Sequence, residues 1–141
     1  MHLATILRHP RSVYIGFSAA LRAPLWISGP RLRSAMEATA EGKTSLERDH
    51  SLELALQVAN GAVRHLARSG TAWKNTCLYR SVTQYLVLRD YGRAAAIKIG
   101  VQGAPDHRDD HGVTAHSWVV YHGPESIQGG GEHFEELRFR A

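Results

Sequence analysis

The spacing of apolar residues changes at Gly92, and this change limits the fold more than any other feature of the sequence. Before Gly92, apolar residues recur at intervals of three and four, as on the buried stripe of an amphipathic helix. After it, residues 94–101 and 114–121 are short apolar segments separated by a polar loop, which is typical of paired strands. The sequence therefore predicts an α+β fold in which helices come first and an antiparallel sheet follows.

The ends of the predicted helices are marked by proline and glycine. Pro24 is expected to end the first helix, because the residue before a proline avoids the α region. Pro30 suits the first turn of a second helix, and Gly70 and Gly92 follow the last turns of the third and fourth. In chain order, the predicted helices are residues 11–22, 30–38, 46–68 and a fourth that starts at residue 75, 76 or 77 and runs to about 91. The predicted strands are residues 94–101, 114–121, 125–128 and 134–139.

The length and charge of the chain predict one domain with an added N-terminal part. A chain of 141 residues can bury a substantial core. We expect residues 1–45 to form a helical N-terminal segment and residues 46–141 to form the main domain. The formal net charge of +4 is spread thinly from Arg8 to Arg140. This charge predicts a mild attraction to acidic partners, and it does not indicate nucleic-acid binding.

The most apolar stretch, residues 12–28, is interrupted by Arg22 and Pro24, so we expect no membrane span. It suits an amphipathic helix that packs on the domain or docks a partner. Charged residues within the first eleven positions interrupt any apolar region of a secretory signal. The chain has a single cysteine, which excludes an intramolecular disulfide and a multi-cysteine zinc site. These features predict a cytoplasmic protein.

The single cysteine, Cys77, lies where a polar loop becomes a helix, and His116 opens the later strand at 114–121. Asn75 and Thr76, just before Cys77, are both good N-cap residues. Helix N-termini favour negative charge, so a thiolate is stabilised at such a place. A nearby imidazole would take the thiol proton and return it to a leaving group. The pattern therefore favours a Cys-His pair for nucleophilic catalysis.

Four short motifs, in order, resemble the transglutaminase-like peptidases of lasso-peptide biosynthesis, which remove a leader peptide from a precursor before its core is cyclised. Taken together, the four are fairly specific, and the resemblance covers roughly residues 47–128. The matching pieces are Cys77-Leu78-Tyr79-Arg80-Ser81, Leu88-Arg89-Asp90-Tyr91-Gly92, Ile97-Lys98-Ile99-Gly100-Val101 and Ala115-His116-Ser117-Trp118-Val119.

This resemblance implies a papain-like Cys-His-Asp triad, in which Cys77 and His116 take the first two positions. The acidic residue of the family lies about a dozen positions after the histidine, where this chain has Gln128 and no aspartate. A glutamine oxygen can accept the imidazole N–H bond, as an asparagine does in papain-like enzymes. Gln128 is therefore the candidate third residue, and the alternatives are Glu125, Glu132 and Asp109.

The oxyanion of the reaction would be held by the backbone N–H of Cys77, with support from Asn75 or Thr76. The resemblance implies no metal and no cofactor. His107 and His111 lie in a loop of solvated aspartates, which does not have the fixed geometry that zinc requires.

The partners implied by the resemblance are the precursor with its leader peptide, a separate leader-recognition protein, and the macrocyclase of the same pathway. We expect the recognition protein to be separate, because 141 residues leave no room for a second folded domain. Its expected docking surface is the apolar N-terminal stretch or the strand region. The residues expected in that stretch are Ile15, Phe17, Leu21, Leu25 and Trp26.

Other interpretations of the same residues stay open at this point. Free cysteine is often a small buried residue, and a histidine in a strand is often part of the core. A domain that lacks the acidic residue could hold peptide without cleaving it, or pass an acyl group to an amine. We expect a structural role for Arg80, pairing with Asp90 or a glutamate.

Overall fold

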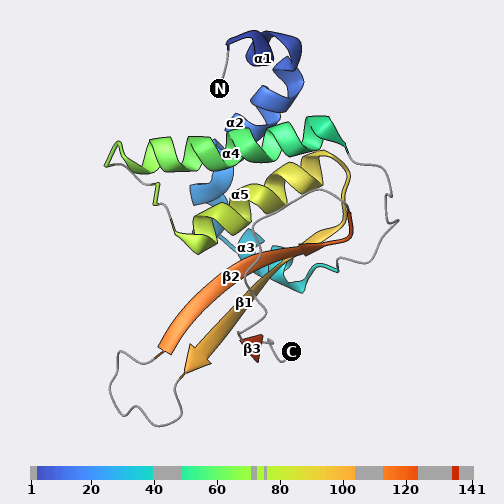
Figure 1. Cartoon of the computed structure of the whole chain (residues 1–141). Helices are drawn as coiled ribbons and strands as arrows, with labels where there is room; N and C mark the ends of the chain where they lie inside the picture. The colour runs from blue at the N-terminus through green and yellow to red at the C-terminus, as the bar shows by residue number, and fades with distance from the viewer. Residues whose placement is uncertain are drawn as a thin grey trace.

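The computed structural model describes residues 3–39, 49–70, 73–74, 76–103, 113–123 and 135–136. Within these residues, helices come first and strands follow, as the change of period at Gly92 predicts (Figure 1). The helices are α1 (Leu3–Arg8), α2 (Pro10–Ile27), α3 (Arg31–Glu37), α4 (His50–Ala67) and α5 (Cys77–Asp90), and the strands are β1 (Ala95–Gly103), β2 (Val113–Tyr121) and β3 (Glu135–Glu136).

The helices α2, α4 and α5 pack against one another and form the helical layer (Figure 1). Gly16 of α2 lies where this helix crosses α4. A Cβ atom at Gly16 would meet the backbone oxygen of Ala55 and come within 2.9 Å of the Val58 Cβ. The two helices therefore approach each other closely because residue 16 has no side chain.

The prediction that Pro24 ends the first helix is wrong, because α2 continues through Pro24 to Ile27. Proline has no N–H, so within a helix the carbonyl four residues earlier loses its partner. Here that carbonyl belongs to Ala20, and it accepts a hydrogen bond of 2.9 Å from the indole Nε1 of Trp73. The helix continues because a donor from another segment replaces the one that proline lacks.

The caps of α4 and α5 agree with the sequence pattern. Asp49 caps α4 by accepting the N–H groups of two residues in its first turn. Thr76 caps α5, and its hydroxyl accepts the N–H of Tyr79 at 3.4 Å. Gly92 follows α5 with a φ of 73°, a conformation that glycine adopts without strain. The predicted ends of these helices are confirmed within a few residues, except that residues 46–48 and Asn75 lie outside the described part.

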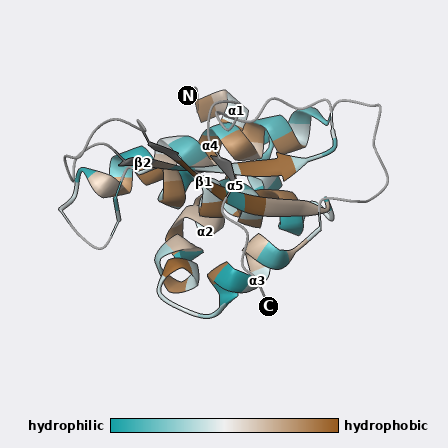
Figure 2. Cartoon of the chain, turned by 90° about the horizontal axis from the view of Figure 1, so that it is seen from below, coloured by the Kyte–Doolittle hydropathy of each residue, from teal (hydrophilic) through white to brown (hydrophobic). Residues whose placement is uncertain are grey.

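The central helix is α5, which contacts α2, α4, β1 and β2. Most residues in its middle are buried, and the polar ones have partners: Gln84 Nε2 donates to Asn60 Oδ1 of α4 at 3.3 Å. The flanking helices carry both apolar and polar residues along their turns (Figure 2). The core joins elements from both halves of the chain. Its buried residues include Ile15, Ala19, Trp26, Leu52, Leu56, Val82, Leu86, Leu88, Ile97 and Val119.

The strands form an antiparallel sheet in the order β2-β1-β3. The β1–β2 ladder starts with Ala95 opposite Tyr121 and ends with Gly103 opposite Val113, so the hairpin is confirmed and its strands extend slightly beyond the predicted ends. The short strand β3 pairs with the other edge of β1, within the predicted segment 134–139. The predicted strand at 125–128 lies outside the described residues.

The predicted N-terminal segment shares its core with the main domain, since Ile15 and Ala35 belong to the same buried cluster as Leu86 and Ile97. The boundary predicted at residue 45 lies outside the described residues. No helix in the described part of the chain combines the length and the apolar character that crossing a membrane requires.

Candidate active site

The N-terminus of α5 presents Cys77 as its first residue, and the thiol is free and half-buried. The first turn of any helix has N–H groups without acceptors in the helix. Thr76 takes up two donors of this turn, because its hydroxyl accepts from Tyr79 and its carbonyl accepts from Arg80 at 3.1 Å. The N–H groups of Cys77 and Leu78 have no acceptor within the helix, so they are the donors left for a ligand at this end.

The segment that leads into Cys77 is fixed to α2 by Trp73. Its indole N–H donates to the Ala20 carbonyl that Pro24 leaves without a partner. Ala20 is fully buried, so this carbonyl needs a hydrogen bond from the protein. The bond holds the chain in place four residues before the cysteine. The sequence signal that could have indicated this role of Trp73 is the proline inside an apolar helix, because it leaves one carbonyl without its helical donor.

A buried pair of hydroxyl groups joins α5 to β2. Ser81 Oγ and Ser117 Oγ lie 3.1 Å apart, and both residues are buried. Ser81 is one helical turn after Cys77 and therefore on the same face of α5. Ser117 directly follows His116 in β2. The structure thus brings the beginning of the cysteine helix next to the strand that carries the histidine.

The side chain of His116 lies on the other face of β2 from Ser117, because neighbouring residues in a strand point to opposite faces. The ring of His116 stacks on Trp118, with centroids 6.2 Å apart and an angle of 18° between the planes, which confirms that these two share a face. Gly100 is opposite His116 in β1, so no side chain of β1 stands directly beside the ring. The backbone of His116 is near α5, and its imidazole is on the sheet face away from the Ser81 contact.

The remaining candidates are not placed. Asn75 and Gln128 lie outside the described residues, and so do Glu125, Glu132 and Asp109. The histidine and aspartate cluster at 106–111 is outside them as well. Within the described ranges, no group of three or more histidine, cysteine, aspartate or glutamate residues could hold a metal ion.

The expected partner of Asp90 is corrected by the structure. Asp90 forms an ion pair with Arg22 of α2, at 2.5 Å, and Arg80 is not its partner. The pair ties the last turn of α5 to α2. The sequence distance between Arg22 and Asp90 explains why this contact was missed, since only the packing of the two helices brings them together.

A capped helix that begins with a free cysteine and packs on an antiparallel sheet is the arrangement of the α+β cysteine-nucleophile folds. The family comparison agrees with this class. The sequence profile of the transglutaminase-like superfamily matches residues 17–138, and the chain belongs to this superfamily. The predicted transglutaminase-like α+β fold is therefore confirmed. The superfamily includes cysteine peptidases and acyltransferases. No curated protein and no solved structure matches the chain.

Proposed function

We propose that this protein is a cysteine peptidase that removes the leader peptide from a ribosomally made precursor of the lasso type, before macrocyclisation. The observation that carries the proposal is the position of Cys77 at the capped start of α5 in a transglutaminase-like chain. The four motifs around Cys77, Leu88, Ile97 and His116 support the choice of leader peptidase within this superfamily.

In the proposed reaction, the Cys77 thiolate attacks the scissile carbonyl and forms an acyl-enzyme. The N–H groups of Cys77 and Leu78 stabilise the oxyanion that develops. His116 takes the thiol proton, gives it to the leaving amine, and then activates the water that releases the acyl group. No metal or cofactor takes part in these steps.

The proposed mechanism requires the Cys77 thiol and the His116 imidazole to come into contact. Their secondary-structure elements adjoin through Ser81 and Ser117, which supports the pairing. The imidazole lies on the far face of β2, so the productive pair requires the strand to turn at His116. Catalytic hydrogen bonds are often long in free enzymes and shorten when the substrate binds. Gln128 is proposed to accept the other imidazole N–H, and Glu125, Glu132 and Asp109 are the alternatives.

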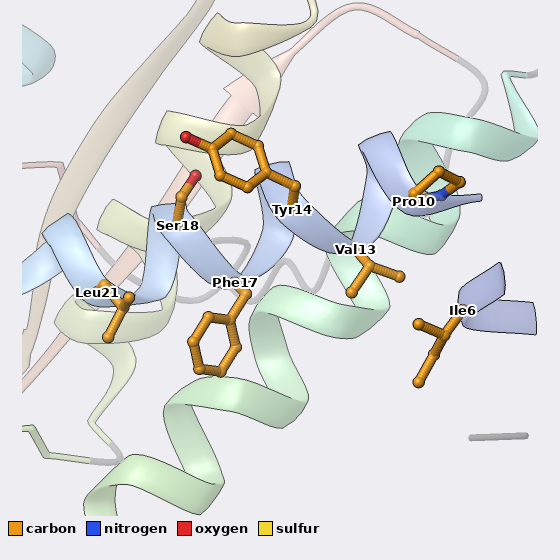
Figure 3. Close-up of a pocket in the computed structure, with 7 residues that line it drawn as sticks. All are labelled: Ile6, Pro10, Val13, Tyr14, Phe17, Ser18 and Leu21. Carbon is orange, nitrogen blue, oxygen red and sulfur yellow. The ribbon is translucent and has the colours of Figure 1, made fainter. Parts of the chain in front are cut away.

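The proposed partners are a separate leader-recognition protein, which presents the precursor, and a macrocyclase that acts on the product. Large exposed apolar side chains gathered on one face favour contact with another protein. On α2, Phe17, Leu21 and Leu25 are exposed, whereas Ile15 and Trp26 belong to the core and are not available for docking. The face has an apolar hollow of about 320 Å³ that is lined from both helices (Figure 3). We propose that the recognition protein docks there.

The test is to incubate a precursor peptide encoded beside this chain with the protein and with Cys77→Ala, with and without the recognition protein. Mass spectrometry should show two fragments whose masses sum to the precursor plus one water. Cys77→Ala should give none and keep the circular dichroism spectrum of the wild type. Cleavage by Cys77→Ala would refute the cysteine-peptidase mechanism, and an amine adduct in place of the hydrolysed fragment would favour acyl transfer.

A further inference from the structure

Three arginines from three different helices gather around Trp26, at the end of α5 opposite Cys77. The guanidinium of Arg31, in α3, lies 5.8 Å from the centre of the Trp26 ring, and that of Arg89, in α5, lies 5.2 Å from it. Arg22, from α2, lines the same hollow as Trp26. Sequence positions 22, 31 and 89 meet only because the three helices pack together.

The charge of this arginine cluster is not balanced. Arg22 pairs with Asp90. Within the described part of the chain, no carboxylate pairs with Arg31 or Arg89, whose contacts there are the stacks on Trp26. Favourable interaction with the carbonyl end of α5 explains one basic residue at position 89. It does not explain Arg31, which comes from another helix.

The packing of Trp26 holds the guanidinium groups of the arginine cluster beside a hollow that could accept an anion. Trp26 is 8% exposed, and its ring packs against Tyr85 with centroids 5.8 Å apart, so the stacking surface is held by the core. A guanidinium that stacks on an aromatic ring keeps its N–H edge free to donate. The cluster borders a hollow of about 480 Å³, and Ser34 adds a hydroxyl group. An acidic group there would meet several oriented donors.

We propose that the arginine cluster binds the carboxylate side chains of an acidic peptide segment. The forked guanidinium matches a carboxylate with two parallel hydrogen bonds. That the ligand is a peptide rests on the proposed function. The cluster and the thiol are at opposite ends of α5, about 18 Å apart along the helix axis.

The test is a binding measurement that does not depend on cleavage. A fluorescein-labelled peptide of alternating glycine and glutamate, and its glycine–glutamine counterpart, are titrated with Cys77→Ala protein at low salt, and anisotropy is recorded. Arg31→Gln and Arg89→Gln are added separately in this background. The matched control is Arg33→Gln, because Arg33 is on α3 as well, is exposed, and pairs with Glu37 away from the cluster.

The glutamate peptide should bind more tightly than the glutamine peptide, and salt should weaken its binding. Arg31→Gln and Arg89→Gln should each lower its affinity about fivefold, and Arg33→Gln should leave it unchanged. Equal affinity for the two peptides, or equal losses in all three variants, would overturn the proposal. So would arginine-dependent binding of inorganic phosphate without any preference for glutamate. A precursor that binds through these arginines and is not cleaved by the wild type would refute the proposed function and leave this site standing.

Discussion

The two ends of α5 differ in what they offer to a ligand, although one buried helix joins them. The first turn has a half-buried thiol and backbone N–H groups without acceptors in the helix, so it is suited to a reacting carbonyl. The last turn has Arg89 and Asp90, which join residues of α2 and α3 in a cationic cluster. The core fixes the distance between these ends. Changes at one end should therefore leave the other end intact, and changes in the middle should affect both.

After the complete loss expected for Cys77→Ala, the largest effect at the first end is expected for His116→Ala. Loss of a general base and acid typically lowers the rate by about 10² to 10⁴, and we expect leader cleavage to fall within this range. Alkylation of Cys77 by iodoacetamide at neutral pH should slow as well, because the variant has no imidazole to take the thiol proton. Affinity for the glutamate peptide should not change. Equal alkylation rates in the variant and the wild type would mean that Cys77 and His116 do not meet.

A change in the buried middle of α5 should disturb both ends. Leu86 is fully buried and packs in the central core. Leu86→Ala should lower the free energy of unfolding by about 2–5 kcal/mol, because it leaves a cavity. Urea denaturation followed by circular dichroism measures this loss. A loss below about 1 kcal/mol would contradict the central position of α5, and Leu25→Ala on the exposed face of α2 is the control that should change stability little.

A smaller effect is expected for Trp73→Phe, which keeps the ring and removes the N–H that bonds to Ala20. A buried carbonyl left without a partner costs about 1–3 kcal/mol. Urea denaturation should show this loss, and the rate of Cys77 alkylation should change because the segment before Cys77 is no longer fixed. Affinity for the glutamate peptide should stay the same. Unchanged stability would show that water or another donor replaces the indole.

The smallest effect is expected for Gln128→Ala. A neutral hydrogen bond contributes about 1 kcal/mol, so cleavage should slow about fivefold if Gln128 orients His116. Gln128→Asp should keep or raise the activity, because a carboxylate stabilises an imidazolium better than an amide does. If alanine at Glu125, Glu132 or Asp109 is the damaging change and Gln128→Ala is silent, the third residue of the triad is one of those.

The elements of this fold were predictable where a local pattern sets them. The stripe that includes Leu52 and Leu56 and the cap at Thr76 are read from neighbouring residues, and the structure confirms α4 and the start of α5. The end of α2 was not predictable, because the donor that lets it continue past Pro24 comes from Trp73, far along the chain. Patterns of neighbouring residues do not predict a contact between segments that are far apart in the chain.

In the candidate site, too, some features follow from neighbouring residues and others depend on contacts between distant segments. The place of Cys77 at a helix start follows from the caps before it. The face of β2 on which the His116 side chain lies depends on the register of the sheet and on which face of the sheet α5 covers. The sequence separation between Cys77 and His116 determines neither of these. The arginine cluster around Trp26 could not be predicted from the sequence, because its members belong to three helices and each arginine alone is typical of a surface charge.

The hydrogen bond between Trp73 and the Ala20 carbonyl also links two distant positions in sequence change. With Pro24 present, a residue at 73 without an N–H donor leaves a buried carbonyl unpaired. With any other residue at 24, the backbone N–H of that residue donates to the Ala20 carbonyl, and the indole N–H of Trp73 is no longer needed there. Related chains should therefore keep proline at 24 and tryptophan at 73 together or replace both. A substitution of Pro24 that restores the helical hydrogen bond would also free the segment that leads to Cys77.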